Sequence, residues 1–230
     1  MYRHGISFVL AVLLGVALAS PAAASVFQDY HVTYGPTVVP DPGQFVTLPQ
    51  FDETTLGTLL SVTLTLESTA SAGTIVWDNE SAVLTDVTLG IGAEVSATGP
   101  SALTLVAVPL QMGTGLGIVA DLAGEVPDPD YAGADSFTVS GGTGTDSDSD
   151  TLTNHALFTP YIGTGTFNVD ISSIVETFVS TTGGTGLTQP TAGQTEGKVT
   201  VRYEYVPEPA TLALLGLGGL GVLLRRSRNK

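Results

Sequence analysis

Between its two ends, this chain is built from short runs in which apolar and polar residues alternate. In residues 58–66, the expected inward face holds Leu60, Val62, Leu64 and Leu66, and the opposite face holds Ser61, Thr63 and Thr65. A period of two puts successive side chains on opposite faces of a strand, so the run predicts a half-buried β-strand. The pattern recurs at residues 167–171 and 198–205. A helical pattern of about 12 residues is absent between the two apolar ends, which leaves an all-β fold.

Further strands are expected at residues 44–48, 74–77, 83–91, 102–108, 117–120 and 136–140, and residues 172–179 fit a strand or a single helical turn. Nine or ten short strands with connections rich in Thr and Gly predict an antiparallel β-sandwich, with a β-barrel as the alternative. Three stretches poor in large apolar residues are expected to be loops: 124–133, 140–150 and 180–195.

The N-terminal end has the three parts of a secretory signal peptide. Arg3 and His4 precede an apolar run at residues 6–18, and small residues follow it. Ala22 and Ala24 occupy the positions that a signal peptidase reads, so cleavage is expected after Ala24 with Ser25 as the new N-terminus. Residues 1–24 are therefore predicted to be a signal helix that is removed on export.

The C-terminal end combines a proline motif, an apolar run and a basic tail. The motif is Val206, Pro207, Glu208 and Pro209, and the apolar run covers residues 210–224. Prolines lack a backbone donor and fix φ, so the motif should stay extended and open to a protease. As a helix, the run would span about 22 Å, less than the roughly 30 Å of a bilayer core. The basic tail would remain cytoplasmic, which predicts a transient transmembrane helix; an ordinary tail anchor is the alternative.

Composition limits the function of the region between these ends, residues 25–205, which is the size of one domain. From Ser25 to Glu208 there are two basic residues, Lys198 and Arg202, against all 22 acidic residues, a formal charge of −20. Such a surface repels phosphate backbones, which excludes nucleic acid as a partner. The chain has no cysteine, and only His31 and His155 lie between the two ends, so thiol chemistry and a His-rich metal site are excluded.

Two acidic stretches are candidates for a weak Ca²⁺ site. Asp146, Asp148 and Asp150 alternate with serine in a predicted loop, where carboxylates could converge on a calcium ion. The stretch departs from the EF-hand pattern, since Thr151 stands where glycine is required and Leu157 where glutamate is required. Residues 126–130 form a second acidic turn, with Asp135 close by in sequence. A solvated acidic loop explains both stretches better, so no cofactor is expected.

Catalytic motifs are not evident in the chain. Two carboxylates suffice for glycoside hydrolysis, but with 22 acidic residues no pattern selects a pair. There is no Gly-x-Ser-x-Gly elbow for acyl transfer. The single tryptophan, Trp77, could stack on a sugar, although an indole at a strand end is more often buried. We therefore expect a protein that is not an enzyme, with a calcium- or carbohydrate-binding module and a glycoside hydrolase as alternatives.

The C-terminal motif, apolar run and basic tail resemble the PEP-CTERM sorting signal of Gram-negative bacteria. The resemblance covers residues 206–230 and implies an exosortase-like protease that recognises Pro207, Glu208 and Pro209. It also implies export, transient anchoring in the inner membrane, and a final place at the cell surface or in the extracellular matrix, where polysaccharide is a possible partner.

Residues 45–66 look like the opening of the choice-of-anchor E domain, chiefly at residues 48–52 and 56–59. Residues 161–167 resemble a second marker of that family, and the closing run at 198–205 is similar too. This resemblance implies an exported structural or adhesive surface domain whose relatives carry different C-terminal anchors. It brings no catalytic residues with it.

Overall fold

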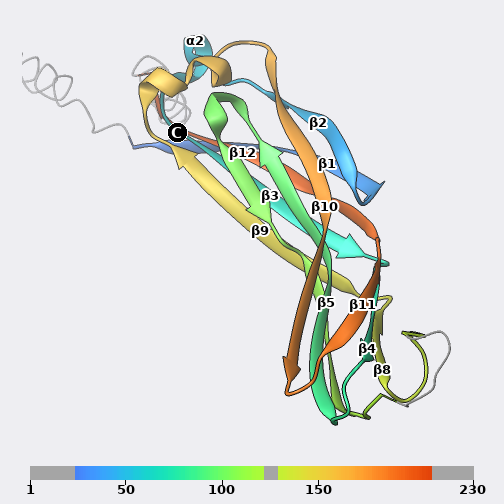
Figure 1. The fold of residues 1–230 in the computed structure, drawn as a ribbon. Coiled ribbons are helices and arrows are strands. Elements are labelled where there is room, and N and C mark those ends of the chain that lie inside the picture. Colours follow the sequence, from blue (N-terminus) through green and yellow to red (C-terminus); the bar gives the residue numbers. More distant parts are fainter. Residues whose placement is uncertain (1–23, 122–128, 209–230) are drawn as a thin grey trace, which may run out of the picture.

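The computed structural model describes residues 24–121 and 129–208, which form three antiparallel sheets (Figure 1). The terminal sheet has the order β1 (Val26–Val38), β12 (Gln194–Pro207), β3 (Gly57–Ser71), β9 (Thr143–Leu152). The long sheet has the order β2 (Asp41–Pro49), β10 (Thr166–Thr182), β5 (Thr85–Thr98), β6 (Thr104–Ala107), and β7 (Leu110–Ile118) also pairs with β5. The distal sheet has the order β11 (Gly186–Thr191), β4 (Thr74–Asn79), β8 (Ser136–Ser140). The predicted all-β, antiparallel fold is confirmed.

In the described part of the chain, four short helical segments connect the strands: α2 (Glu53–Leu56), η1 (Pro100–Ala102), η2 (His155–Leu157) and η3 (Thr159–Tyr161). Among the described residues, no helix is long and apolar enough to cross a membrane. The predicted signal helix and sorting helix lie outside the described residues, except for Ala24, which precedes β1.

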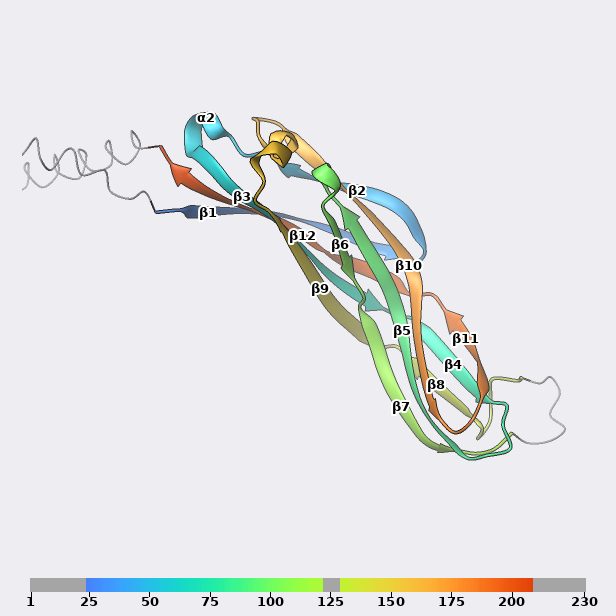
Figure 2. The ribbon, with the colours of Figure 1, turned by 60° about the vertical axis from the view of Figure 1, so that its left-hand side comes forward.

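The molecule is an elongated sandwich in which the long sheet faces two smaller sheets, one at each end (Figure 2). The terminal sheet and its part of the long sheet enclose one apolar core, and we call this the terminal half. The distal sheet packs on β5 around a second core, and we call this the distal half. Strands β5 and β10 run through both halves.

The terminal and distal sheets are one set of strands interrupted at a single level. Chain order links β3 to β4, β8 to β9, and β11 to β12, and the same neighbours pair on both sides of each interruption. Glycine stands at all three breaks, as Gly73, Gly142 and Gly193. A Cβ added at Gly73 would lie 2.9 Å from Ile91 Cγ1, so this break packs closely on β5. These glycine breaks divide the sandwich into its terminal and distal halves.

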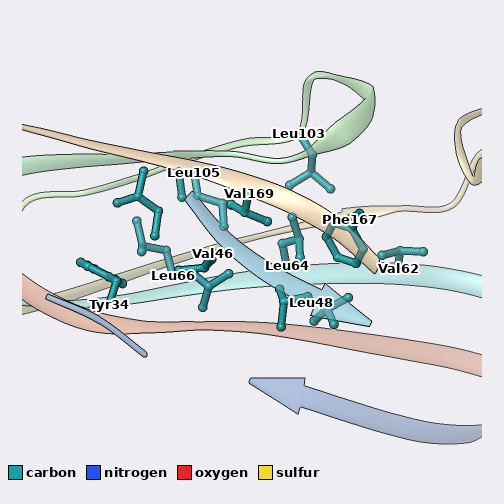
Figure 3. Close-up of a cluster of buried hydrophobic side chains, with 14 of the residues drawn as sticks. Tyr34, Val46, Leu48, Val62, Leu64, Leu66, Leu103, Leu105, Phe167 and Val169 are labelled. Carbon is teal, nitrogen blue, oxygen red and sulfur yellow. The ribbon is translucent and has the colours of Figure 1, made fainter. Parts of the chain in front are cut away.

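Side chains from both sheets fill the terminal core (Figure 3). In β3, Val62, Leu64 and Leu66 point inward and are fully buried, as the alternation predicts. The prediction for Leu60 is wrong: Leu59 is buried in its place, and Leu60 is only partly buried. The register with β12 shifts between Leu59 and Ser61, and this β-bulge moves the inward face by one residue.

Several predicted loops are strands. Residues 143–150, expected in a loop, belong to β9, and residues 180–195 contain the end of β10, all of β11 and the start of β12. Most residues of β9 and β11 are exposed and polar. These strands therefore lack the alternation of apolar and polar residues that predicts a strand from sequence. Of the loop predicted at 124–133, residues 122–128 lie outside the described residues. Residues 172–179 are strand, and β1 was not expected.

Candidate functional site: the C-terminal motif and its surroundings

The first half of the C-terminal motif is part of the folded domain. Val206 and Pro207 are the last residues of β12 and pair with Thr58 and Gly57 of β3. Glu208 follows the strand and is exposed, and Pro209 lies outside the described residues. Val206 and Pro207 are therefore extended, but they are paired in the sheet and do not form an open chain. The strand ends directly at the acidic residue of the motif.

Gly57 makes this close pairing possible. It ends α2 with φ of +127°, a backbone conformation that other residues rarely adopt. A Cβ at this position would collide with the backbone oxygen of Val206 and would lie 2.9 Å from the backbone nitrogen of Glu208. Asp52 caps α2 by accepting a hydrogen bond from Thr54 N at 3.0 Å. The hydroxyl of Thr54 lowers the pKa of Asp52, followed by that of Thr55, so the cap stays ionised.

Both ends of the described domain lie at the same end of the sandwich (Figure 2). Val26 at the start of β1 pairs with Tyr205 near the end of β12. Ala24 and Ser25, which flank the predicted signal-peptidase cleavage, are exposed just before β1, and Ala22 lies outside the described residues. The predicted signal-peptidase and exosortase sites therefore flank the same pair of strands.

An ion pair ties β1 to β12 near these ends. Arg202 donates two hydrogen bonds to the Asp29 carboxylate, each 2.8 Å long, and its guanidinium lies 5.6 Å from the ring centre of Phe27. The hydrogen bond from Arg202 lowers the pKa of Asp29 below its ordinary value. Because both side chains are about half exposed, this pair contributes little stability and mainly fixes the register of β1.

The acidic stretch Asp146, Asp148 and Asp150 lies on strand β9, so the predicted calcium loop does not exist as a loop. The carboxylates of Asp146 and Asp148 accept hydrogen bonds from Val108 N at 2.7 Å and from Val106 N at 2.9 Å. These amides belong to the free edge of β6 and its extension in the long sheet. The two aspartates thus close the gap between the terminal and long sheets along one side of the sandwich.

Asp150 has no hydrogen bond to the described residues of the long sheet, and its carboxylate accepts one from the adjacent Thr151 N at 2.7 Å. Within the described residues, no group of three or more His, Cys, Asp or Glu side chains is placed to hold a metal ion. His31 and His155 are exposed, on β1 and η2.

Trp77 is a core residue of the distal half, 1 % exposed, and is not available to stack on a sugar. The next two residues, Asp78 and Asn79, are also buried. Asn79 donates to Val119 O at 2.6 Å and to Val83 O at 3.0 Å, and it accepts from Ser81. Asp78 lies beside Asp135, a residue pair that the sequence did not bring together.

The two segments that resemble the choice-of-anchor E family meet at the terminal end of the sandwich. Phe51 pairs with Ile162 in an isolated bridge, and Phe51 N donates to Tyr161 O at 2.8 Å. Gln50 donates to Pro160 O at 2.9 Å and accepts from Gly165 N at 3.1 Å. Burial raises the pKa of Tyr161, whose hydroxyl donates to the backbone oxygen of Pro100. These segments close the end of the terminal core beside the sorting motif.

A family model described as the PEP-CTERM protein-sorting motif matches residues 206–228. The match indicates a secreted protein that an exosortase-type system sorts after transient membrane anchoring. No curated protein matches the chain.

Alignments to solved structures are weak. Dimeric latent PorU from Porphyromonas gingivalis aligns at 10 % identity with a TM-score of 0.32, covering 82 % of this chain and 14 % of that chain. Infectious bursal disease virus, Gx strain, aligns at 10 % identity with a TM-score of 0.16, covering 90 % of this chain and 49 % of that chain. The chain thus spans less than half the length of either protein, and these scores carry no functional information.

Proposed function

We propose that this chain is an exported structural or adhesive protein of the cell surface or extracellular matrix, delivered by an exosortase-type protease, with no catalytic activity of its own. The observation that carries the proposal is the continuity between β12 and the sorting motif. The last paired residue of the domain is Pro207, and the matched motif begins one residue earlier, at Val206. The folded domain is therefore held against the membrane surface without a spacer.

This arrangement suits a protein whose sorting is followed by display. Both ends of the domain lie at the terminal end, so the distal half projects away from the membrane during sorting. A formal charge of −20 keeps the exported domain soluble and repels anionic lipid. The structural role further rests on the resemblance to the choice-of-anchor E domain, whose two marker segments pack together beside the motif.

A carboxylate-based hydrolase is a weaker candidate on the same evidence. A hollow beside strands β3, β9 and β12 of the terminal sheet is lined by Glu67, Asp146 and Lys198, among others. Glu67 is held by Lys198 at 2.7 Å, and Asp146 is engaged by Val108 N. Neither carboxylate is left free for the acid and base roles of glycoside hydrolysis.

Replacing Pro207-Glu208-Pro209 with alanines tests the proposal. We expect the full-length variant to accumulate in the inner membrane, whereas the wild type is processed and exported. Intact mass spectrometry of the exported protein locates both cleavages and any attached group. The chain supplies a matched control in Pro127-Asp128-Pro129, a second proline-acid-proline sequence whose replacement should leave processing intact. Unchanged processing of the Pro207 variant at the same bond would show that the motif is not what the protease recognises.

A further inference from the structure

Two buried carboxylates meet in the distal half without satisfying each other. Asp78 is 4 % exposed and Asp135 is 2 % exposed. The Oδ1 atom of each is buried and has no hydrogen-bond partner among the described residues. Buried polar atoms are nearly always paired, and an unpaired buried charge is costly, so two such oxygens together require an explanation.

Strand pairing makes the two residues diagonal neighbours at the end of the β4–β8 ladder. Asp78 pairs with Ser136, the first residue of β8, and Asp135 directly precedes Ser136. The backbone nitrogen of Asn79 donates to the backbone oxygen of Asp135 at 3.0 Å. Gly133 keeps the space beside Asp135 clear, since a Cβ there would lie 3.0 Å from Asp135 Oδ1.

The charged residues that act on Asp78 are themselves acidic. Burial raises the pKa of Asp78, and repulsion from Asp135 and Asp130 raises it further. The hydrogen bond from Tyr131 N to Asp78 Oδ2, which is 3.1 Å long, opposes this rise in the pKa of Asp78. The carboxylate of Asp130 is turned to Ala132 N at 2.8 Å.

No basic side chain of the domain can neutralise this pair. Lys198 and Arg202 are the only lysine and arginine between Ser25 and Glu208, and they bind Glu67 and Asp29 in the terminal half. His31 is on β1 and His155 is in η2, both at the terminal half. The partner of Asp78 and Asp135 must therefore come from solvent, as a cation or a shared proton.

We infer that Asp78 and Asp135 bind a calcium ion through their free Oδ1 atoms. Calcium accepts carboxylate, backbone carbonyl and water oxygens in flexible numbers, whereas Mg²⁺ requires near-ideal octahedral geometry and gives up water reluctantly. The absence of histidine and cysteine ligands disfavours zinc. Because only two carboxylates are placed to bind, the affinity should fall in the weak extracellular range, with a Kd of about 0.1–1 mM. The ion would fasten the turn at residues 130–135 to the end of β4.

Thermal unfolding of the purified full-length protein at neutral pH tests the inference. At a Ca²⁺ concentration of about ten times the Kd, we expect the Tm to rise by about 3–5 °C, and by clearly less in Mg²⁺. Asp78→Asn and Asp135→Asn should each abolish this difference between the two ions. Asp150→Asn removes the same charge from β9 and should retain it. An equal rise in Tm with both ions in the wild type would mean that the ions only screen the −20 charge, and it would overturn the proposed calcium site.

Terbium luminescence provides a second measurement that does not depend on stability. Trp77 is the only tryptophan and directly precedes Asp78, so Tb³⁺ bound at this site should be excited through the indole. We expect Ca²⁺ to displace the signal and Asp135→Asn to remove it. If Asp78→Asn stabilises the protein in EDTA while the response to Ca²⁺ and Tb³⁺ persists, the carboxylates share a proton and the ion binds elsewhere. The sorting test with the Pro207-Glu208-Pro209 replacement does not depend on the outcome of the thermal unfolding or terbium measurements.

Discussion

The terminal and distal halves of the sandwich share one long sheet but are stabilised differently. Among the described residues, the terminal core contains 23 buried apolar side chains and the distal core contains 6. The distal half also buries two carboxylates, Asp78 and Asp135, whereas the buried polar residues of the terminal half are serines and a threonine. Apolar packing stabilises without directional demands, whereas buried polar groups stabilise only when every partner is present. The half that carries the sorting motif is thus the one whose stability depends least on solution conditions.

The glycine breaks explain how the two halves can be stabilised differently within one domain. Strands β3, β9 and β12 stop at the glycine breaks, whereas β5 and β10 continue across them. The distal sheet therefore depends on β5 for its apolar contacts. We expect the distal half to open locally at a lower free energy than the terminal half, as regions with few buried contacts do.

Truncating matched leucines in the two cores should give the largest effects. Leu64 and Leu89 are both fully buried, and replacing Leu64 with alanine should cost about 2–5 kcal/mol of unfolding free energy. Leu89→Ala should instead speed hydrogen exchange in β4, β8 and β11 while β3 and β12 stay protected. Urea unfolding and hydrogen exchange measure the two outcomes.

Thr63→Ala is the control on the outer face of β3, where the Thr63 hydroxyl contacts that of Thr151 at 2.8 Å. Its cost should stay below about 1 kcal/mol. Equal costs for Leu64→Ala and Thr63→Ala would reverse the assigned faces, and uniform exchange in Leu89→Ala would show that the halves unfold as one unit.

Gly57→Ala should loosen the terminal half at the sorting motif. A Cβ at this left-handed position collides with β12, at a cost of about 1–3 kcal/mol. We expect the last pairs of β12 to detach, so that the motif is processed faster in a pulse-chase experiment. Gly43→Ala is the matched control, since Gly43 also has a positive φ, +147°, but its nearest contact is Ile171 O at 3.8 Å. Slower processing of Gly57→Ala would mean that strand pairing presents the motif to the protease.

The aspartates of β9 should show a smaller, position-dependent effect. Asp146→Ala and Asp148→Ala each remove an acceptor from an amide of the long sheet and should cost about 0.5–1.5 kcal/mol. Asp150→Ala removes the same charge without such a contact and should cost less than about 0.5 kcal/mol. Three equal values from denaturant unfolding would show that charge, and not closure of the sheet edge, governs this stretch.

The pH dependence of Asp78 should be the smallest effect. Because burial raises its pKa, the folded state binds a proton more tightly than the unfolded state. The stability that Asp78 contributes to the folded state is therefore present below its unfolded-state pKa of about 3.9, and it is lost as the pH rises through its raised folded-state pKa. Without divalent ions, Asp78→Asn should flatten the fall in Tm between about pH 4 and 7 by less than about 3 °C.

Asp29 should change stability with pH in the opposite direction, because Arg202 lowers its pKa. Its contribution is present above the unfolded pKa and is lost as pH falls, so Asp29→Asn should lower the Tm near neutral pH and have less effect in acid. A Tm profile for Asp78→Asn that runs parallel to the wild type would contradict the raised pKa.

Strand positions were predictable where one face of a strand meets a core. Residues 62–66, 167–171 and 199–203 alternate because every second side chain enters the terminal core, and their inward faces were predicted correctly. Strands β9 and β11 lacked that signal, since most of their residues are exposed and polar. The bulge at Leu60 was equally hidden, because it depends on the register with β12, more than 140 residues away.

The sequence by itself determined the chemistry of the two ends, the β-class of the domain and its strongly anionic surface, because these follow from local composition and periodicity. Only the tertiary structure decided what the carboxylates do. Asp146 and Asp148 became acceptors for a sheet edge, and Asp78 met Asp135 across the start of β8. In a chain with 22 acidic residues, the role of each carboxylate depends on which of them are brought together and desolvated. That pairing is set by strand register over long sequence distances, which local pattern does not encode.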